Sequence, residues 1–151
     1  ALMEYVFDTG FSRGGVFVTE DVNGVLVLYD PVLAPARVSD YFRQLKLIHK
    51  CVGWSRMRYA SSKDKKMASF RPATSHLYLQ MIGIDPASQG KGVGSELIRF
   101  MQEKSRVESR PIYLETSVNK NVEMYLRKGF VVHGDWKIRE DYHVHFMNWT
   151  K

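Results

Sequence analysis

One stretch, residues 82–97, constrains the fold of this chain more than any other. It reads Ile-Gly-Ile-Asp-Pro-Ala-Ser-Gln-Gly-Lys-Gly-Val-Gly-Ser-Glu-Leu, so an apolar strand runs through a glycine-rich turn into a helix. Gly90, Gly92 and Gly94 permit backbone conformations that other residues avoid, and consecutive N–H groups can then converge at the positive end of the helix. The stretch therefore predicts a site for a phosphate-bearing ligand.

The two common nucleotide motifs do not fit this turn. A Walker A loop needs Gly-x-x-x-x-Gly-Lys followed by Ser or Thr, and this spacing is absent. In the dinucleotide fingerprint Gly-x-Gly-x-x-Gly, Gly90 and Gly92 would need a third glycine where Ser95 stands. We therefore do not expect ATP or GTP hydrolysis, and a glycine-rich turn without a ligand remains the alternative.

A second motif follows at a fixed distance. Residues 121–130 read Asn-Val-Glu-Met-Tyr-Leu-Arg-Lys-Gly-Phe, with Tyr125 four residues before Gly129 and Phe130. Together with the run Gln-Gly-Lys-Gly-Val-Gly at residues 89–94, this resembles the two signatures of the GNAT superfamily of N-acetyltransferases. One helix and one strand separate the signatures, and two motifs in order are far more specific than either alone.

The resemblance implies an α/β (α+β) fold, with a mixed, mostly antiparallel twisted sheet flanked by helices. Members of the family usually begin with a strand and a helix that this chain lacks, so we expect an N-terminally shortened single domain over residues 1–151. Acetyl-coenzyme A is the implied co-substrate, and no metal is expected.

The resemblance also implies the residues of the donor site. The pantetheine arm would lie along the backbone of Ile82, Gly83 and Ile84 as an added strand. Tyr125 would donate a proton to the departing thiolate, although simple packing is the alternative for a tyrosine on a short helix. Asn119 and Asn121 are candidates for contact with the pantetheine. The pyrophosphate would be held by the residues of the turn: Gln89, Gly90, Lys91, Gly92, Val93, Gly94 and Ser95.

The general base is a separate question. Glu115 lies within the apolar strand predicted over residues 112–116, where a carboxylate is costly unless it is paired or functional. Catalysis and pairing with an Arg or Lys are both consistent with this position. His76, Tyr78 and Gln80 are expected to share one face of the central strand and could position a water molecule instead.

Two other patterns invite chemistry but have simpler explanations. His143 and His145 alternate onto one face of the last strand, yet no third ligand has the spacing of a zinc site. Cys51 is the only cysteine, so no internal disulfide can form, and we expect a buried thiol in a reducing cytoplasm.

The composition limits the remaining classes. A chain of 151 residues supports one domain, and no apolar run approaches the roughly 20 residues that span a bilayer. The net charge of +6 is spread among acids, so it is expected to steer anionic coenzyme A rather than bind nucleic acid. We expect no membrane partner, and a homodimer is left open. The residues expected to contribute to the positive field are Lys63, Lys65, Lys66, Arg71 and Lys91.

Periodicity and turn residues predict the elements. Strands are expected over residues 16–20, 25–29, 76–84, 112–116, 130–136 and 142–149, and helices over 1–9, 38–52, 54–70, 93–104 and 119–128. Gly10 should end the first helix, and Asn23-Gly24 should close a hairpin. The strand–helix–strand order over 76–116 predicts one parallel pair with a right-handed crossover.

These observations favour transfer of the acetyl group of acetyl-coenzyme A to a primary amine of a small molecule by direct attack. Two alternatives share the donor site: a coenzyme A-binding or regulatory module with impaired transfer, and an acetyltransferase acting on a protein or peptide amine. The acceptor itself cannot be read from the fold, because many acceptors share it.

Overall fold

The computed structural model describes residues 2–33 and 57–150. The helices are α1 (Leu2–Ser12), α3 (Met57–Ala68), α4 (Val93–Glu108) and α5 (Asn119–Leu126), and a short 3-10 helix, η3 (Pro86–Ser88), precedes α4. The strands are β1 (Val16–Val18), β2 (Gly24–Tyr29), β3 (Leu77–Ile84), β4 (Ile112–Thr116), β5 (Val131–Arg139) and β6 (Tyr142–Trp149). The helix expected over residues 38–52, including Cys51, lies outside the described residues.

The strands form one sheet in the order β1-β2-β3-β4-β6-β5. Among the described strands, β3 and β4 are parallel, and all other neighbours are antiparallel. Because α4 connects the parallel pair, the predicted strand–helix–strand unit and the mixed, mostly antiparallel sheet are both confirmed. None of the helices in the described ranges is long and apolar enough to span a membrane.

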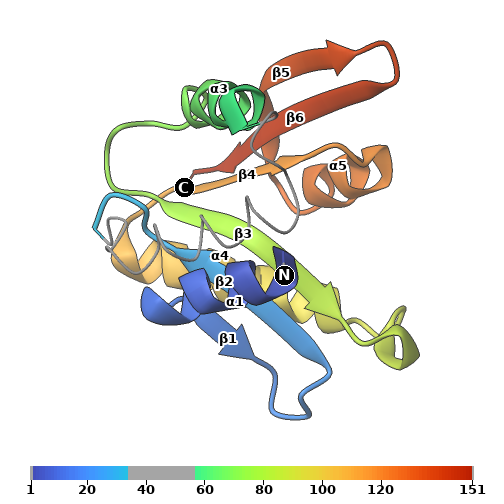
Figure 1. The fold of residues 1–151 in the computed structure, drawn as a ribbon. Helices are drawn as coiled ribbons and strands as arrows, with labels where there is room; N and C mark the ends of the chain where they lie inside the picture. Colours follow the sequence, from blue (N-terminus) through green and yellow to red (C-terminus); the bar gives the residue numbers. More distant parts are fainter. Residues whose placement is uncertain (1, 34–56, 151) are drawn as a thin grey trace.

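The main core lies between the sheet and α4. Val93, Leu97, Ile98 and Met101 are buried on one side of this helix and pack with apolar side chains from β2, β3 and β4. In Figure 1, α4 runs behind the sheet while α1 crosses in front of β2. The two helices therefore cover opposite faces, which explains why β2 and the start of β3 are apolar on both sides.

The face opposite α4 carries a second group of apolar and aromatic side chains. Val27, Tyr29 and Tyr78 are buried there against Val6 of α1. Further along the same face, Phe70 stacks on Phe146 of β6, with ring centroids 3.9 Å apart. Phe70 follows α3, which lies beside β5 and β6 in Figure 1.

The first helix corrects one expectation. We predicted that Gly10 would end it, but α1 continues through Gly10 to Ser12. A Cβ at Gly10 would lie 2.5 Å from Cγ1 of the fully buried Val27, so glycine permits close packing of α1 on β2. The chain turns instead at Gly14, whose φ is +65°, and Gly15 donates its N–H to the Gly10 carbonyl (2.9 Å).

The substitution Gly10→Val tests this packing. Helix propensity alone would make valine slightly stabilising, whereas the contact with Val27 predicts a loss of about 1–3 kcal/mol in the free energy of unfolding. Urea denaturation measures the difference. The control is Phe11→Ala, because Phe11 is 80% exposed and its loss should change stability little. Equal or greater stability of Gly10→Val would contradict the packing.

Candidate active site

The parallel strands β3 and β4 separate after two paired positions. Leu77 pairs with Ile112 and Tyr78 with Tyr113, and no later residue of β3 pairs with β4. Within the described residues, the edge of β3 that faces β4 therefore has no strand partner from residue 79 to residue 84. We call this opening the β3–β4 fork, and Figure 1 shows the two strands diverging there.

A β-bulge explains why the strands separate. In the β2–β3 ladder, Leu28 pairs with Leu79 but Val27 pairs with Met81, so Gln80 is an extra residue in β3. A bulge bends its strand and increases the local twist. Beyond it β3 follows β2, while β4 remains paired with β6 along its whole length. An unpaired strand edge is a template for an extended ligand that adds as a further strand.

The open edge of β3 leads directly into the glycine-rich turn. Asp85 accepts a hydrogen bond from the Ala87 N–H (3.0 Å), which shapes η3, and the chain then passes through residues 89–92 into α4. Gly90 and Gly92 have φ values of +78° and +91°, in the left-handed region that glycine favours. The two positions therefore require glycine for the conformation predicted from the sequence.

The N-terminus of α4 is free to bind an anion. Gly92 is its N-cap and no side chain caps it, so the first N–H groups of the helix, those of Val93, Gly94 and Ser95, have no intrahelical acceptor. A Cβ at Gly90 or Gly92 would meet no atom within 4 Å, so the space in front of the turn is open. This end of α4 fits a pyrophosphate, which backbone N–H groups and the helix dipole would bind.

The side chains of the turn take different roles. Val93 is buried in the core with Leu97, so only its backbone faces the turn. Gly94 packs against β3, because a Cβ there would lie 2.9 Å from Cδ1 of Ile84. Gln89 and Lys91 are exposed. The predicted pyrophosphate residues are thus contiguous with Ile82–Ile84, and most of them would contribute N–H groups rather than side chains.

Tyr125 lies in α5 on the α4 side of the sheet. Its side chain is 4% exposed and packs on Phe130, with ring centroids 5.3 Å apart. Its carbonyl accepts the N–H groups of Lys128 and Phe130, a tight turn that requires the φ of +82° at Gly129. Burial raises the pKa of Tyr125 to about 12, so the phenol is protonated at neutral pH.

Glu115 belongs to a different group of residues. One of its carboxylate oxygens, Oε1, accepts hydrogen bonds from Nη2 of Arg71 (2.9 Å) and from the hydroxyl of Tyr78 (2.6 Å). The Arg71 guanidinium also lies 3.9 Å from the centre of the Tyr78 ring. Burial and the adjacent Glu115 raise the pKa of Tyr78 well above its usual value. Of the two roles expected for Glu115, pairing and catalysis, the structure shows the pairing, with Arg71.

Tyr125 and Glu115 lie on opposite faces of the sheet. Tyr125 packs in the same cluster as Leu114, and side chains alternate between faces along β4, so Glu115 points to the other side. Tyr78, the partner of Glu115, is likewise in the cluster that packs against Val6 of α1. The structure therefore does not bring the two predicted catalytic residues onto one face. The β3–β4 fork is an opening in the sheet that separates them.

The remaining candidates fall outside this arrangement. Asn119 and Asn121 are exposed at the start of α5, the helix that carries Tyr125. The Nδ1 atoms of His143 and His145 lie 3.7 and 2.9 Å from the carboxylate oxygens of Asp135 in β5. Among the described residues, no group of three or more His, Cys, Asp or Glu side chains is arranged to hold a metal ion.

Sequence reasoning missed two features near the fork. We expected His76, Tyr78 and Gln80 to share one face, but the bulge at Gln80 interrupts the alternation, and His76 Nδ1 is occupied by the Thr74 carbonyl (2.8 Å). Gln102 of α4 donates to the Lys128 carbonyl (2.8 Å) and ties the turn after Tyr125 to α4. No local pattern signals either feature.

The family model of the acetyltransferase (GNAT) domain matches residues 45–132, which is more than half of the chain. The chain therefore belongs to the GNAT family of acetyltransferases, and the resemblance stated from the two motifs is confirmed.

Solved structures share this fold. They include the histone acetyltransferase HPA2 and related acetyltransferase from Corynebacterium glutamicum, which is 19% identical and aligns over 98% of this chain and 73% of that chain with a TM-score of 0.62. Drosophila melanogaster polyamine N-acetyltransferase is 12% identical, with 85% and 69% coverage and a TM-score of 0.55. Arabidopsis thaliana NAA60 in complex with acetyl-CoA is 14% identical, with 87% and 67% coverage and a TM-score of 0.53. Over eight such matches, this chain spans 54% to 76% of the other chain's length.

The substitution Gly92→Val tests the role of the turn. A side chain at φ +91° is strained by about 1–2 kcal/mol and would enter the open space where an anion would bind. We expect acetyl-coenzyme A to bind at least about tenfold more weakly, measured by titration calorimetry. Gly14→Val is the matched control, because Gly14 also has a positive φ and open space but lies away from the turn. Equal affinities of the two variants would contradict the assignment.

Proposed function

We propose that this chain is an acetyl-coenzyme A-dependent N-acetyltransferase that transfers the acetyl group to a primary amine of a small molecule by direct attack. The observation that carries the proposal is the β3–β4 fork, whose unpaired edge leads into the uncapped N-terminus of α4. When bound, acetyl-coenzyme A would supply an acetyl group activated as a thioester.

The chain's own residues would hold the donor through the backbone. Along residues 82–84 the backbone groups alternate between the two edges of β3, so the N–H and C=O groups of Ile82 and Ile84 lie on the unpaired edge and would bond to the extended arm, while Gly83 pairs with Val25 of β2. The N–H groups of residues 90–95 other than Lys91 would bind the pyrophosphate, because the Lys91 N–H donates to the Ser88 carbonyl (3.3 Å), and the Lys91 side chain would add a positive charge. Asn119 and Asn121 are retained as candidate contacts to the arm because they begin the helix that carries Tyr125.

Tyr125 is suited to donate a proton to the leaving thiolate. Its hydroxyl makes no hydrogen bond to any other residue in the described part of the chain, so it is available to a ligand. A pKa of about 12 is above the roughly 8.5 of an ordinary thiol. Burial disfavours a thiolate at the same position as it disfavours the phenolate, which narrows this difference.

Glu115 is the candidate to bind or deprotonate the amine on the other face. Arg71 and Tyr78 occupy Oε1 and fix the side chain, while Oε2 has no hydrogen-bond partner among the described residues. A second function rests on the same observation: if the pair with Arg71 is purely structural, the chain is a coenzyme A-binding module with impaired transfer.

The similarity in fold to a polyamine N-acetyltransferase supports testing small amines first. The experiment measures acetyl-coenzyme A binding by calorimetry and thiol release with polyamines, other small primary amines and a short peptide with a free N-terminus. We expect binding and turnover with a small amine. Turnover with the peptide alone would move the acceptor to proteins, binding without turnover would favour the impaired module, and absence of binding would contradict both.

The substitution Tyr125→Phe tests the proton donor. Phenylalanine keeps the packing on Phe130 but has no hydroxyl, so we expect kcat to fall about 10²-fold while KM for acetyl-coenzyme A changes little. Tyr142→Phe, in the exposed last hairpin, is the control. An unchanged kcat would contradict the assignment.

The pH profile gives an independent test of the same residue. Because burial raises its pKa to about 12, Tyr125 remains protonated as pH rises through the neutral range, and its ionisation should cause no loss of rate below about pH 10. Steady-state rates of the unaltered protein and of Tyr125→Phe over this range measure it. A loss of rate near neutral pH that disappears in Tyr125→Phe would contradict the raised pKa.

A further inference from the structure

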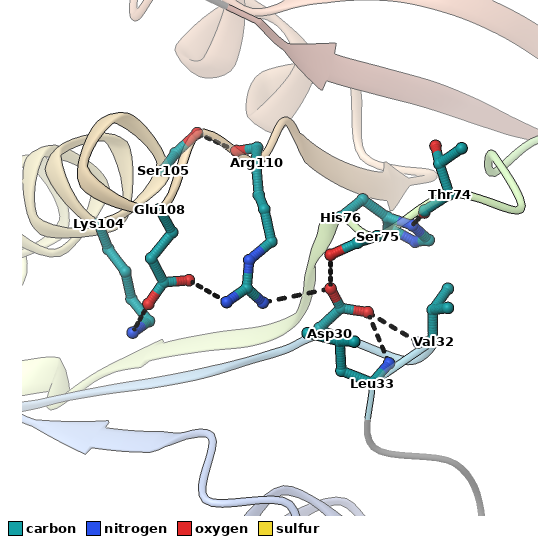
Figure 2. Close-up of polar contacts among 10 residues, drawn as sticks. All are labelled: Asp30, Val32, Leu33, Thr74, Ser75, His76, Lys104, Ser105, Glu108 and Arg110. Carbon is teal, nitrogen blue, oxygen red and sulfur yellow. Dashed lines mark hydrogen bonds and ion pairs between the residues drawn. The ribbon is translucent and has the colours of Figure 1, made fainter.

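Asp30, directly after β2, carries a buried carboxylate that Figure 2 shows at the centre of a polar network. Its Oδ1 accepts the N–H groups of Val32 (2.8 Å) and Leu33 (3.1 Å), and Oδ2 accepts hydrogen bonds from Ser75 Oγ (2.5 Å) and Arg110 Nη1 (3.2 Å). Burial alone would raise the pKa of Asp30. The hydrogen bonds and the charge of Arg110 outweigh it and lower the pKa, so the carboxylate is ionised at neutral pH.

Ser75 and Arg110 place this network just beyond the closed end of the fork. Leu77 pairs with Ile112, and Ser75 and Arg110 each stand two residues before one of these partners. They therefore occupy the place of the second pair beyond the closed end of the fork, after His76 and Pro111. A single oxygen of Asp30 joins them, in addition to the hydrogen bond from the Leu77 N–H to the Pro111 carbonyl (2.9 Å).

The network is anchored in α4. Arg110 also bonds to Glu108 (3.0 Å), which pairs with Lys104, and the Ser105 hydroxyl donates to the Arg110 carbonyl. Lys104, Ser105 and Glu108 belong to the last turns of α4, the helix whose first turn faces the glycine-rich turn. Asp30 thus connects β2, the start of β3 and the C-terminal end of α4 at one point (Figure 2).

We propose that Asp30 is a positioning residue that sets the opening of the β3–β4 fork and thereby the affinity for the arm of the bound thioester. The inference rests on the proposed function. Two paired positions are a short ladder for strands that a bulge bends apart, so the closed end needs a further connection. Asp30 supplies that connection at the end of the fork away from the glycine-rich turn.

The test compares two ligands in Asp30→Asn. Acetyl-coenzyme A needs both the fork and the turn, whereas ADP carries a pyrophosphate but no arm and needs only the turn. By calorimetry, we expect acetyl-coenzyme A to bind about tenfold more weakly to the variant. ADP affinity should stay within about twofold. Glu103→Gln is the control, because Glu103 also pairs with an arginine, Arg106 (3.0 Å), but its side chain is 64% exposed.

Equal loss of both affinities, or no loss of either, would overturn the proposal, because general destabilisation does not distinguish the arm from the pyrophosphate. If Asp30→Asn does not fold, Ser75→Ala carries the comparison, since it removes one contact and leaves the pair with Arg110. We expect a smaller loss in the same direction. A Ser75→Ala protein with unchanged selectivity would also overturn the proposal.

A ligand-free measurement separates this proposal from the proposed function. Amide hydrogen exchange at residues 77–78 and 112–113 should be faster in Asp30→Asn, or in Ser75→Ala, than in the unaltered protein. Unchanged exchange there would overturn the role of Asp30 whatever the chain binds. Failure of the unaltered protein to bind acetyl-coenzyme A would instead contradict the proposed function.

Discussion

The separation of β3 from β4 after two paired positions is the constraint on which the rest of the structure depends. It requires the bulge at Gln80, which bends β3, and the full pairing of β4 with β6, which holds β4 away. The result is an unpaired strand edge inside a six-stranded sheet, which is costly unless something adds to it. The same edge ends at the glycine-rich turn, so a single extended ligand can bond both to the unpaired backbone groups of β3 and to the free N–H groups at the turn.

The fork also decides how the chemistry is divided. Tyr125 is buried on the α4 side, where burial keeps its phenol protonated, and the group of Glu115, Arg71 and Tyr78 lies on the other face. In the proposed reaction, the amine therefore approaches the acetyl carbon from the Glu115 side of the sheet, and the C–S bond breaks with the thiolate leaving toward Tyr125 on the other side. Direct attack needs the amine and the thioester in place at once, and this arrangement separates the path of the amine from that of the departing thiolate.

Local signals in the sequence were sufficient for much of this account. Gly90, Gly92 and the turn at Gly129 depend on backbone conformation, and the apolar strands depend on periodicity, both of which neighbouring residues determine. Contacts between distant residues were not predictable. Glycine at position 10 allows α1 to pack closely on Val27. Glu115 pairs with Arg71, 44 residues away in the sequence, and Asp30 pairs with Arg110, 80 residues away.

Amide hydrogen exchange on addition of acetyl-coenzyme A tests the central claim most directly. An arm that adds to the open edge of β3 would protect amides within residues 79–84, and a pyrophosphate on the turn would protect those of residues 90–95. The account predicts protection of both segments, with ADP protecting only the second. Binding of acetyl-coenzyme A without added protection of β3 would contradict it.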